Sequence, residues 1–84
     1  MAAPGAEEPE FVRLVDARGL RCPEPVMLLH NAIRKAAAGE VLKLVATDPS
    51  TRRDVSRFCN YLGHKLLVET VREEEFCYFI RRGG

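Results

Sequence analysis

The chain has 84 residues, of which 46% are hydrophobic and 30% charged, a size and composition that suit one small globular domain. Thirteen basic and twelve acidic side chains give a net charge of +1, so the overall charge gives no basis for binding nucleic acid. No apolar run approaches the ~20 residues needed to cross a bilayer, and the start MAAPGAEEPEF lacks the build of a secretory signal, so a cytoplasmic location is expected.

The first part of the chain predicts a tail, a strand and a turn. Residues 1–9 are small and acidic and are expected to form a flexible tail, followed by one domain over residues 10–84. Apolar and β-branched residues alternate loosely near residues 10–17, which predicts a strand. Gly19 then allows the positive φ of a short turn.

A helix is predicted from Pro23, with Gly39 as its stop, because apolar side chains recur at helical intervals. The residues of this apolar stripe are Val26, Met27, Leu28, Leu29, Ala32, Ile33, Ala36 and Ala37.

The second half of the chain predicts a strand over residues 40–47 and then a second helix. Asp48 can cap that helix, Pro49 suits its first position and Gly63 ends it. Its apolar positions, spaced i, i+3, i+4 and i+7, are Val55, Phe58, Cys59 and Leu62. Two strands over residues 64–71 and 75–82, joined by the charged turn REEE, predict a closing hairpin.

The element order β-α-β-α-β-β predicts an α/β (α+β) two-layer sandwich. Right-handed crossovers place both helices on the same face of a four-stranded mixed sheet. The other face is expected to be open to solvent or to a partner.

Cys22 lies at or just before the predicted helix start, where free N–H groups and the helix dipole favour a thiolate. Arg21 adds a nearby positive charge, with Arg18 as a second source. Pro23 and Pro25 make the first turn rigid without losing a helical hydrogen bond. These features favour a reactive, accessible thiol, while a small buried side chain is the alternative interpretation.

The other potential ligands do not form a metal pattern. Cys59 and Cys77 fall at packing positions of a helix and a strand, and three widely spaced cysteines match no zinc motif. His30 and His64 have no second histidine at ligand spacing. A bound metal is therefore not expected.

Several segments carry a family resemblance, which covers residues 12–84. GLRCPEPVM with its C-P-x-P core, the upstream VDA, the downstream TDPSTRRDVSRFCNYLGH and the ending YFIRRGG resemble the TusA/SirA family of small sulfur-carrier proteins. That resemblance implies the βαβαββ sandwich already expected from the element order.

The resemblance also implies a function. A cysteine desulfurase would pass a sulfane sulfur to Cys22, forming a persulfide, and Cys22 would pass the sulfur to a relay protein. The path would end at 2-thiouridine in the wobble position of certain tRNAs. Such a protein is a sulfurtransferase-type carrier more than an enzyme with free turnover, needs no cofactor of its own, and is expected to be a monomer.

Residues beside the motif are expected to support it. Asp16 and Arg18 match a family segment before Cys22, where Asp16 can bond turn amides or orient Arg18. Glu24 suits the helix start, although its charge opposes a neighbouring thiolate.

Arg52, Arg53 and Arg57 are interpreted as a solvated helix face or as a docking patch for an acidic partner surface. Stable contact with nucleic acid is not expected.

Two other functions remain possible from the residues. Cys22 could be a monothiol redox or peroxide sensor, or it could be incidental in a module that binds RNA or a regulatory protein. The terminal Gly-Gly resembles that of ubiquitin-like sulfur carriers, but their fold begins with a hairpin, so a frayed end is expected here.

Overall fold

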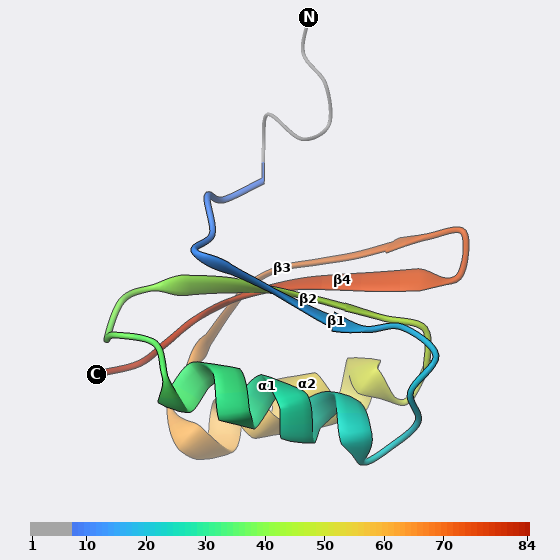
Figure 1. Ribbon diagram of the computed structural model, residues 1–84, viewed down its shortest axis with the longest axis horizontal. Helices are drawn as coiled ribbons and strands as arrows, with labels where there is room; N and C mark the ends of the chain where they lie inside the picture. The colour runs from blue at the N-terminus through green and yellow to red at the C-terminus, as the bar shows by residue number, and fades with distance from the viewer. Residues whose placement is uncertain (1–7) are drawn as a thin grey trace, which may run out of the picture.

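The computed structural model describes residues 8–84 and contains one four-stranded sheet with two helices beneath it (Figure 1). The elements are β1 (Arg13–Ala17), α1 (Glu24–Arg34), β2 (Val41–Ala46), α2 (Thr51–Leu62), β3 (Lys65–Arg72) and β4 (Glu75–Arg81). This order and layering confirm the predicted two-layer sandwich. Within residues 8–84, neither helix has the length and apolar content to cross a membrane.

The strand order is β1-β2-β4-β3. β1 pairs with β2 in parallel, and β4 lies antiparallel between β2 and β3. β1 and β2, and likewise β2 and β3, are therefore parallel strands connected by a helix. Right-handed crossovers then place α1 and α2 on one side of the sheet, as Figure 1 shows.

α1 ends earlier than the apolar stripe predicts, at Arg34 and not near Gly39. Its last carbonyls are capped from the far end of the chain, because Nη1 of Arg82 donates to the carbonyls of Ile33 (3.0 Å) and Ala36. Gly39, at φ 87°, forms the turn into β2.

α2 begins after a turn that contains Asp48, and it ends at Gly63, as predicted. Ser50 is the N-cap, and Oδ1 of Asp48 accepts its N–H at 3.0 Å. At the other end Gly63 takes the left-handed conformation, with φ 78°, and the N–H of His64 donates to the carbonyl of Cys59.

The core lies between the helices and the sheet. Its largest fully buried side chains from the strands and helices are Leu29, Leu42, Leu44, Val55, Tyr78 and Ile80. The one polar pair in this core is satisfied internally, since the hydroxyls of Thr51 and Tyr78 lie 2.7 Å apart.

The second sheet face is partly covered, contrary to the expectation of an open surface. Phe79 points away from the core cluster and is nevertheless fully buried. The ring of Phe11 packs on it at 6.0 Å between centroids, and Nζ of Lys43 lies 5.4 Å from the Phe79 ring. Glu8 approaches Lys43 at 3.9 Å. Of the predicted tail, residues 1–7 lie outside the described residues, whereas Glu8 contacts the domain.

The C-terminal Gly-Gly is also not wholly frayed, as had been expected. The N–H of Gly83 donates to Nδ1 of His64 at 3.0 Å. A Cβ at Gly83 would collide with the carbonyl oxygen of Gly63, so only glycine fits this close approach. Gly84 is exposed with open space around it.

Candidate functional site

Cys22 is an exposed free thiol in the loop between β1 and α1. The helix begins two residues later, with Pro23 as the N-cap and Pro25 buried in the first turn. Pro23 therefore lies one position before the predicted one. The N–H of Glu24 donates to the carbonyl of Arg21 at 2.8 Å, which closes the loop into the helix. The predicted corner position and exposure of Cys22 are thus present in the structure.

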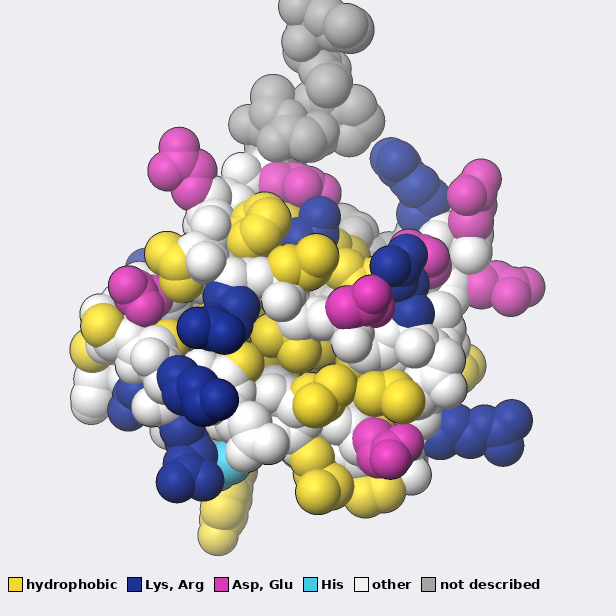
Figure 2. All heavy atoms as spheres, in the orientation of Figure 1, with side chains coloured by type: hydrophobic (Ala, Val, Ile, Leu, Met, Phe, Trp, Pro, Cys, Tyr) yellow, Lys and Arg dark blue, Asp and Glu magenta, His cyan; other side chains and the backbone are white. Residues whose placement is uncertain are grey.

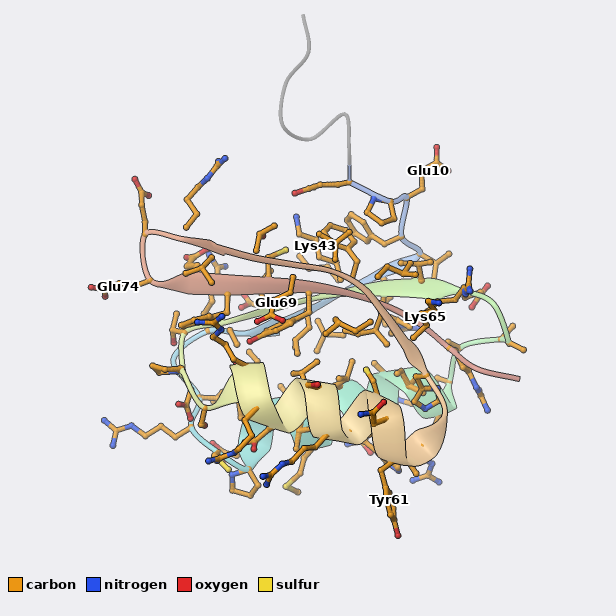
Figure 3. The ribbon with its side chains drawn as sticks, turned by 180° about the vertical axis from the view of Figure 1, so that it is seen from behind. Glu10, Lys43, Tyr61, Lys65, Glu69 and Glu74 are labelled. Carbon is orange, nitrogen blue, oxygen red and sulfur yellow. The ribbon has the colours of Figure 1, made fainter. Side chains whose placement is uncertain are left out.

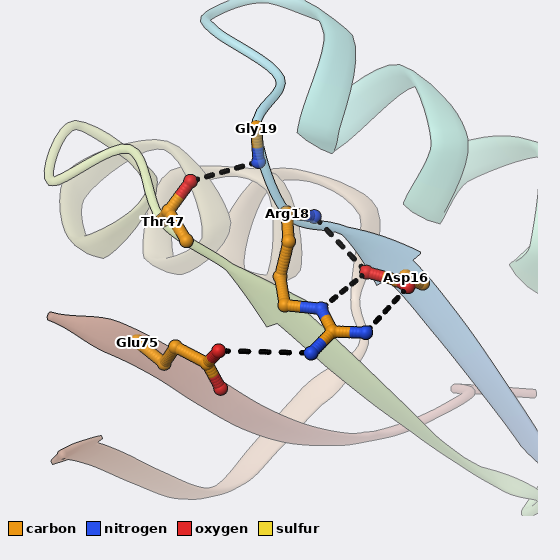
Figure 4. A network of polar contacts seen from close by, with 5 residues as sticks. All are labelled: Asp16, Arg18, Gly19, Thr47 and Glu75. Carbon is orange, nitrogen blue, oxygen red and sulfur yellow. Dashed lines mark hydrogen bonds and ion pairs between the residues drawn. The ribbon is translucent and has the colours of Figure 1, made fainter. Parts of the chain in front are cut away.

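Two residues after β2 hold this loop in place. Oγ1 of Thr47 accepts the N–H of Gly19 at 2.9 Å (Figure 4), and Oδ2 of Asp48 accepts the N–H of Cys22 at 2.8 Å. The contacts are possible because β1 and β2 are parallel neighbours whose carboxyl ends meet at Ala17 and Ala46. A shallow polar depression lies here, lined by Gly19, Leu20, Arg21, Thr47 and Asp48.

The charges around the thiol differ from those expected. The pKa of Cys22 is raised, chiefly by hydrogen bonding with the carboxylate of Asp54 in the first turn of α2, and further by partial desolvation and by the charges of Asp54 and Asp48. Arg53 acts in the opposite direction. The prediction of a lowered pKa is therefore wrong, because acidic groups of α2 and of the loop before it act on the thiol and raise its pKa.

The two arginines expected near the thiol act elsewhere. Arg21 is exposed, and its charge helps to lower the pKa of Asp48, after the larger effect of the N–H donors of Ser50 and Cys22. Arg18 is bound to Asp16 by two side-chain hydrogen bonds of 3.0 and 2.9 Å and approaches Glu75 at 3.6 Å (Figure 4). These bonds hold the pKa of Asp16 at about 2. Asp16 therefore orients Arg18, and it also accepts the backbone N–H of Arg18 at 3.1 Å, so both contacts predicted for it are present.

The arginines of α2 lie on an exposed face with carboxylates among them. Nε of Arg52 lies 3.2 Å from Glu69 of β3, and Nε of Arg53 lies 3.2 Å from Asp54. Arg57 is exposed. Figure 3 shows Glu69 on the strand side of α2. A docking role for the three arginines stays a prediction.

Sequence periodicity misplaced two apolar side chains. Met27 is 56% exposed and Leu28 is also exposed, although the helical stripe assigned both to the buried face. Figure 2 shows hydrophobic side chains gathered over the outer surface of α1. On α2, Tyr61 is 88% exposed and points away from the sheet (Figure 3).

The other cysteines lack the setting of Cys22. Cys59 is 3% exposed, and burial raises its pKa to about 11. Cys77 is half-buried on the second sheet face, where burial also raises its pKa. Within residues 8–84, no three side chains of His, Cys, Asp or Glu are grouped to hold a metal ion.

Comparison with known proteins places this site in a family. The family model described as Sulfurtransferase TusA matches residues 13–82. The "Sulfur carrier protein TusA" of Pseudomonas putida is 56% identical over 69 residues, covering 82% of this chain and 86% of that protein. The protein of the same name from Pseudomonas paraeruginosa is 52% identical, covering 82% and 87%.

A solved structure shares the fold. A SirA-like protein from Desulfitobacterium hafniense superposes with a TM-score of 0.76 at 20% identity, covering 87% of this chain and all of that one. Both the matched residues and the fold include the Cys22 corner, and the chain therefore belongs to the TusA family of sulfurtransferases.

Proposed function

We propose that this protein is a sulfur carrier that holds a sulfane sulfur as a persulfide on Cys22. The donor is the active-site persulfide of a cysteine desulfurase, and the acceptor is the next protein of a sulfur relay. The relay supplies 2-thiolation of the wobble uridine in tRNA. The protein works in the cytoplasm, as a monomer, and contributes no cofactor of its own.

The exposed thiol at the start of α1 is the observation that carries the proposal. Cys22 is the one exposed cysteine of the three, and the C-P-x-P segment around it lies within the family match. The most similar relatives described above bear the name sulfur carrier. An exposed sulfur on a rigid corner can enter the active site of a larger partner, which a buried thiol such as Cys59 cannot do.

The transfer balances without an external oxidant. The Sγ atom of Cys22 loses its proton and attacks the terminal sulfur of the donor persulfide. A bond forms between Sγ and that sulfur while the donor S–S bond breaks, and its electron pair leaves on the donor sulfur, which takes up a proton. The donor cysteine is thereby reduced and Cys22 is oxidised to the same extent. Passage to the acceptor cysteine repeats this exchange.

The exposed surface beside the Cys22 thiol suits the recognition of a partner protein. Met27 and Leu28 lie on α1, a few residues after Cys22, and Arg57 lies on the exposed face of α2. Such a mixture of apolar and cationic groups suits a transient protein interface, in which charge speeds encounter and apolar contact retains the partner.

The test is a loading experiment with a purified cysteine desulfurase and cysteine. Mass spectrometry should find an adduct of one sulfur atom on the Cys22 peptide, and dithiothreitol should remove it. The Cys22→Ser variant should stay unmodified. The matched variants Cys59→Ala and Cys77→Ser should still load, because neither thiol is exposed.

Two results would contradict the proposal. Sulfur that persists on the protein in Cys22→Ser would move the carrier site to another residue. Rapid oxidation of Cys22 by peroxide, with no uptake of sulfur from the desulfurase, would indicate the redox sensor that the sequence also allows.

A further inference from the structure

The loop between β1 and α1, which carries Cys22, is held by two side chains of the segment that follows β2. The N–H of Gly19 donates to Oγ1 of Thr47 at 2.9 Å (Figure 4), and the N–H of Cys22 donates to Oδ2 of Asp48 at 2.8 Å. The pairing of β1 with β2 ends before these residues. The two side chains therefore continue the connection between the segments beyond the end of the sheet.

Asp48 is itself fixed from the core. Its carbonyl accepts the N–H of Thr51 at 3.0 Å and the Thr51 hydroxyl at 2.7 Å, and its Oδ1 accepts the N–H of Ser50 at 3.0 Å. Thr51 is 1% exposed, and its hydroxyl lies 2.7 Å from that of Tyr78. The backbone of Cys22 is thus connected, through one aspartate, to the buried core.

These contacts hold the backbone of the loop and leave the sulfur accessible, because Cys22 is exposed. The distinction matters for an exchange between two proteins, in which the reacting sulfur atoms must be aligned. A loop that moves in solution loses conformational entropy when it is ordered for the reaction, whereas a loop that is already held loses little. A small reagent reaches an exposed thiol from many directions and does not need this order.

We propose that Thr47 and Asp48 are positioning residues of the sulfur transfer, because they hold the Cys22 loop in the conformation that presents its sulfur to a protein donor. This inference rests on the proposed function. In the step itself, Sγ of Cys22 loses its proton to solvent and attacks the terminal sulfur of the donor persulfide. The new S–S bond forms as the donor S–S bond breaks, and the electron pair leaves on the donor sulfur, which takes up a proton. Thr47 and Asp48 act on this step by fixing the N–H groups of Gly19 and Cys22.

Position and charge have opposite effects at Asp48. The pKa of Cys22 is raised chiefly by hydrogen bonding with Asp54, and the charge of Asp48 adds to the rise. Removing that charge should increase the thiolate fraction, while removing the hydrogen bond to the loop should slow the transfer. Thr47 carries no charge, so its variants change position alone. Asp54 and its ion-pair partner Arg53, 3.2 Å away, stay in place in every variant below.

The first test measures transfer from a protein donor. A purified cysteine desulfurase is supplied with cysteine and increasing concentrations of the carrier, and mass spectrometry follows the one-sulfur adduct on the Cys22 peptide. Thr47→Val, which removes the acceptor and keeps the approximate shape, should lower the maximal rate about three- to tenfold, as expected for one lost hydrogen bond. The carrier concentration at half-maximal rate should change little. Thr47→Ser should restore the rate, and Asp48→Ala should lower it at least as far.

The second test measures the thiol alone, as the rate of alkylation of Cys22 by iodoacetamide at neutral pH. The rate should be that of the wild type in Thr47→Val, and equal or higher in Asp48→Ala, because a negative charge is lost. Thr70→Val is the matched control, since it makes the same chemical change at an exposed position of the edge strand β3. It should match the wild type in both tests. Circular dichroism of each variant confirms that the comparison is between folded proteins.

The outcomes separate this inference from the proposed function. A wild-type protein that takes no sulfur from the desulfurase refutes the proposed function, whatever the variants do. Normal loading of the wild type with the same maximal rate in Thr47→Val refutes the positioning role alone. Equal slowing of transfer and alkylation in that variant also refutes it, because the thiol and not its presentation would then be changed. Faster transfer in Asp48→Ala would show that charge, and not position, controls the step.

Discussion

Asp48 accepts the backbone N–H of Cys22, with 2.8 Å between nitrogen and Oδ2, across 26 positions of the chain. The other oxygen of the same carboxylate accepts the N–H of Ser50 at 3.0 Å. One side chain thus connects the loop that carries the thiol to the start of α2. The position of Cys22 depends on the second helix as much as on its own.

Replacing Asp48 by alanine should destabilise the protein and loosen the Cys22 loop. The N–H groups of Cys22 and Ser50 lose their acceptor, and unsatisfied donors of this kind cost about 1–3 kcal/mol. Urea denaturation measures the free energy of unfolding. Asp48→Asn, which keeps one acceptor oxygen, should lose less. Equal stability of the alanine variant and the wild type would show that water replaces the carboxylate without cost.

The Asp48 contact shows which part of the site the sequence could predict. The position of Cys22 at the start of a helix follows from a local pattern, namely prolines followed by apolar residues at helical spacing. The sequence therefore predicts it correctly. The bond from Asp48 depends on β1 and β2 lying side by side, which no local pattern contains, so Asp48 was assigned only a capping role. The same limit applies to Asp54: its place on a predicted helix gave no indication that its carboxylate raises the pKa of Cys22.

Gly83 should not tolerate a side chain. A Cβ would collide with the carbonyl oxygen of Gly63 and disturb the hydrogen bond from Gly83 to His64. Gly83→Ala should therefore lower the free energy of unfolding by about 1–3 kcal/mol, the range for forced overpacking. Gly84→Ala is the matched control, because it has open space around it and should leave stability unchanged. Similar stability of both variants would mean that the C-terminal segment moves aside freely.

Arg82 should stabilise the end of α1. Its Nη1 donates to the carbonyls of Ile33, in the last turn of α1, and of Ala36, just beyond the helix, and its charge lies at the negative end of the helix dipole. Arg82→Ala should cost about 1–2 kcal/mol of unfolding free energy, as expected for charged hydrogen bonds. The exposed neighbour Arg81 provides the control, since Arg81→Ala should change stability little. Equal effects of the two substitutions would contradict a capping role.

These two C-terminal residues, together with Phe11, mark the limit of fold prediction from periodicity. The alternation of strands and the helical stripes determined the element order and the core, because those patterns directly record which side chains are buried. Arg82 was expected only as the last residue of a strand and Gly83 as part of a frayed end, since no periodic pattern indicates contacts for either residue. Phe79 alternates onto the second sheet face, but its cover by Phe11 comes from a segment before β1 that no pattern connects to it.

His64 should make stability depend on pH. Burial, together with the positive charges of Arg82 and His30, lowers the pKa of His64 below its ordinary 6.5, and Nδ1 must be unprotonated to accept the N–H of Gly83. Between pH 6.5 and the lower folded value, the unfolded chain therefore binds more protons than the folded protein. The free energy of unfolding should fall as the pH decreases through that window. The contribution of His64 to stability should be complete above pH 6.5. Urea denaturation between about pH 7.5 and pH 5.5 measures the slope. In His64→Gln, which can accept a hydrogen bond but does not titrate, the slope should be smaller; an unchanged slope would assign the pH dependence to other groups.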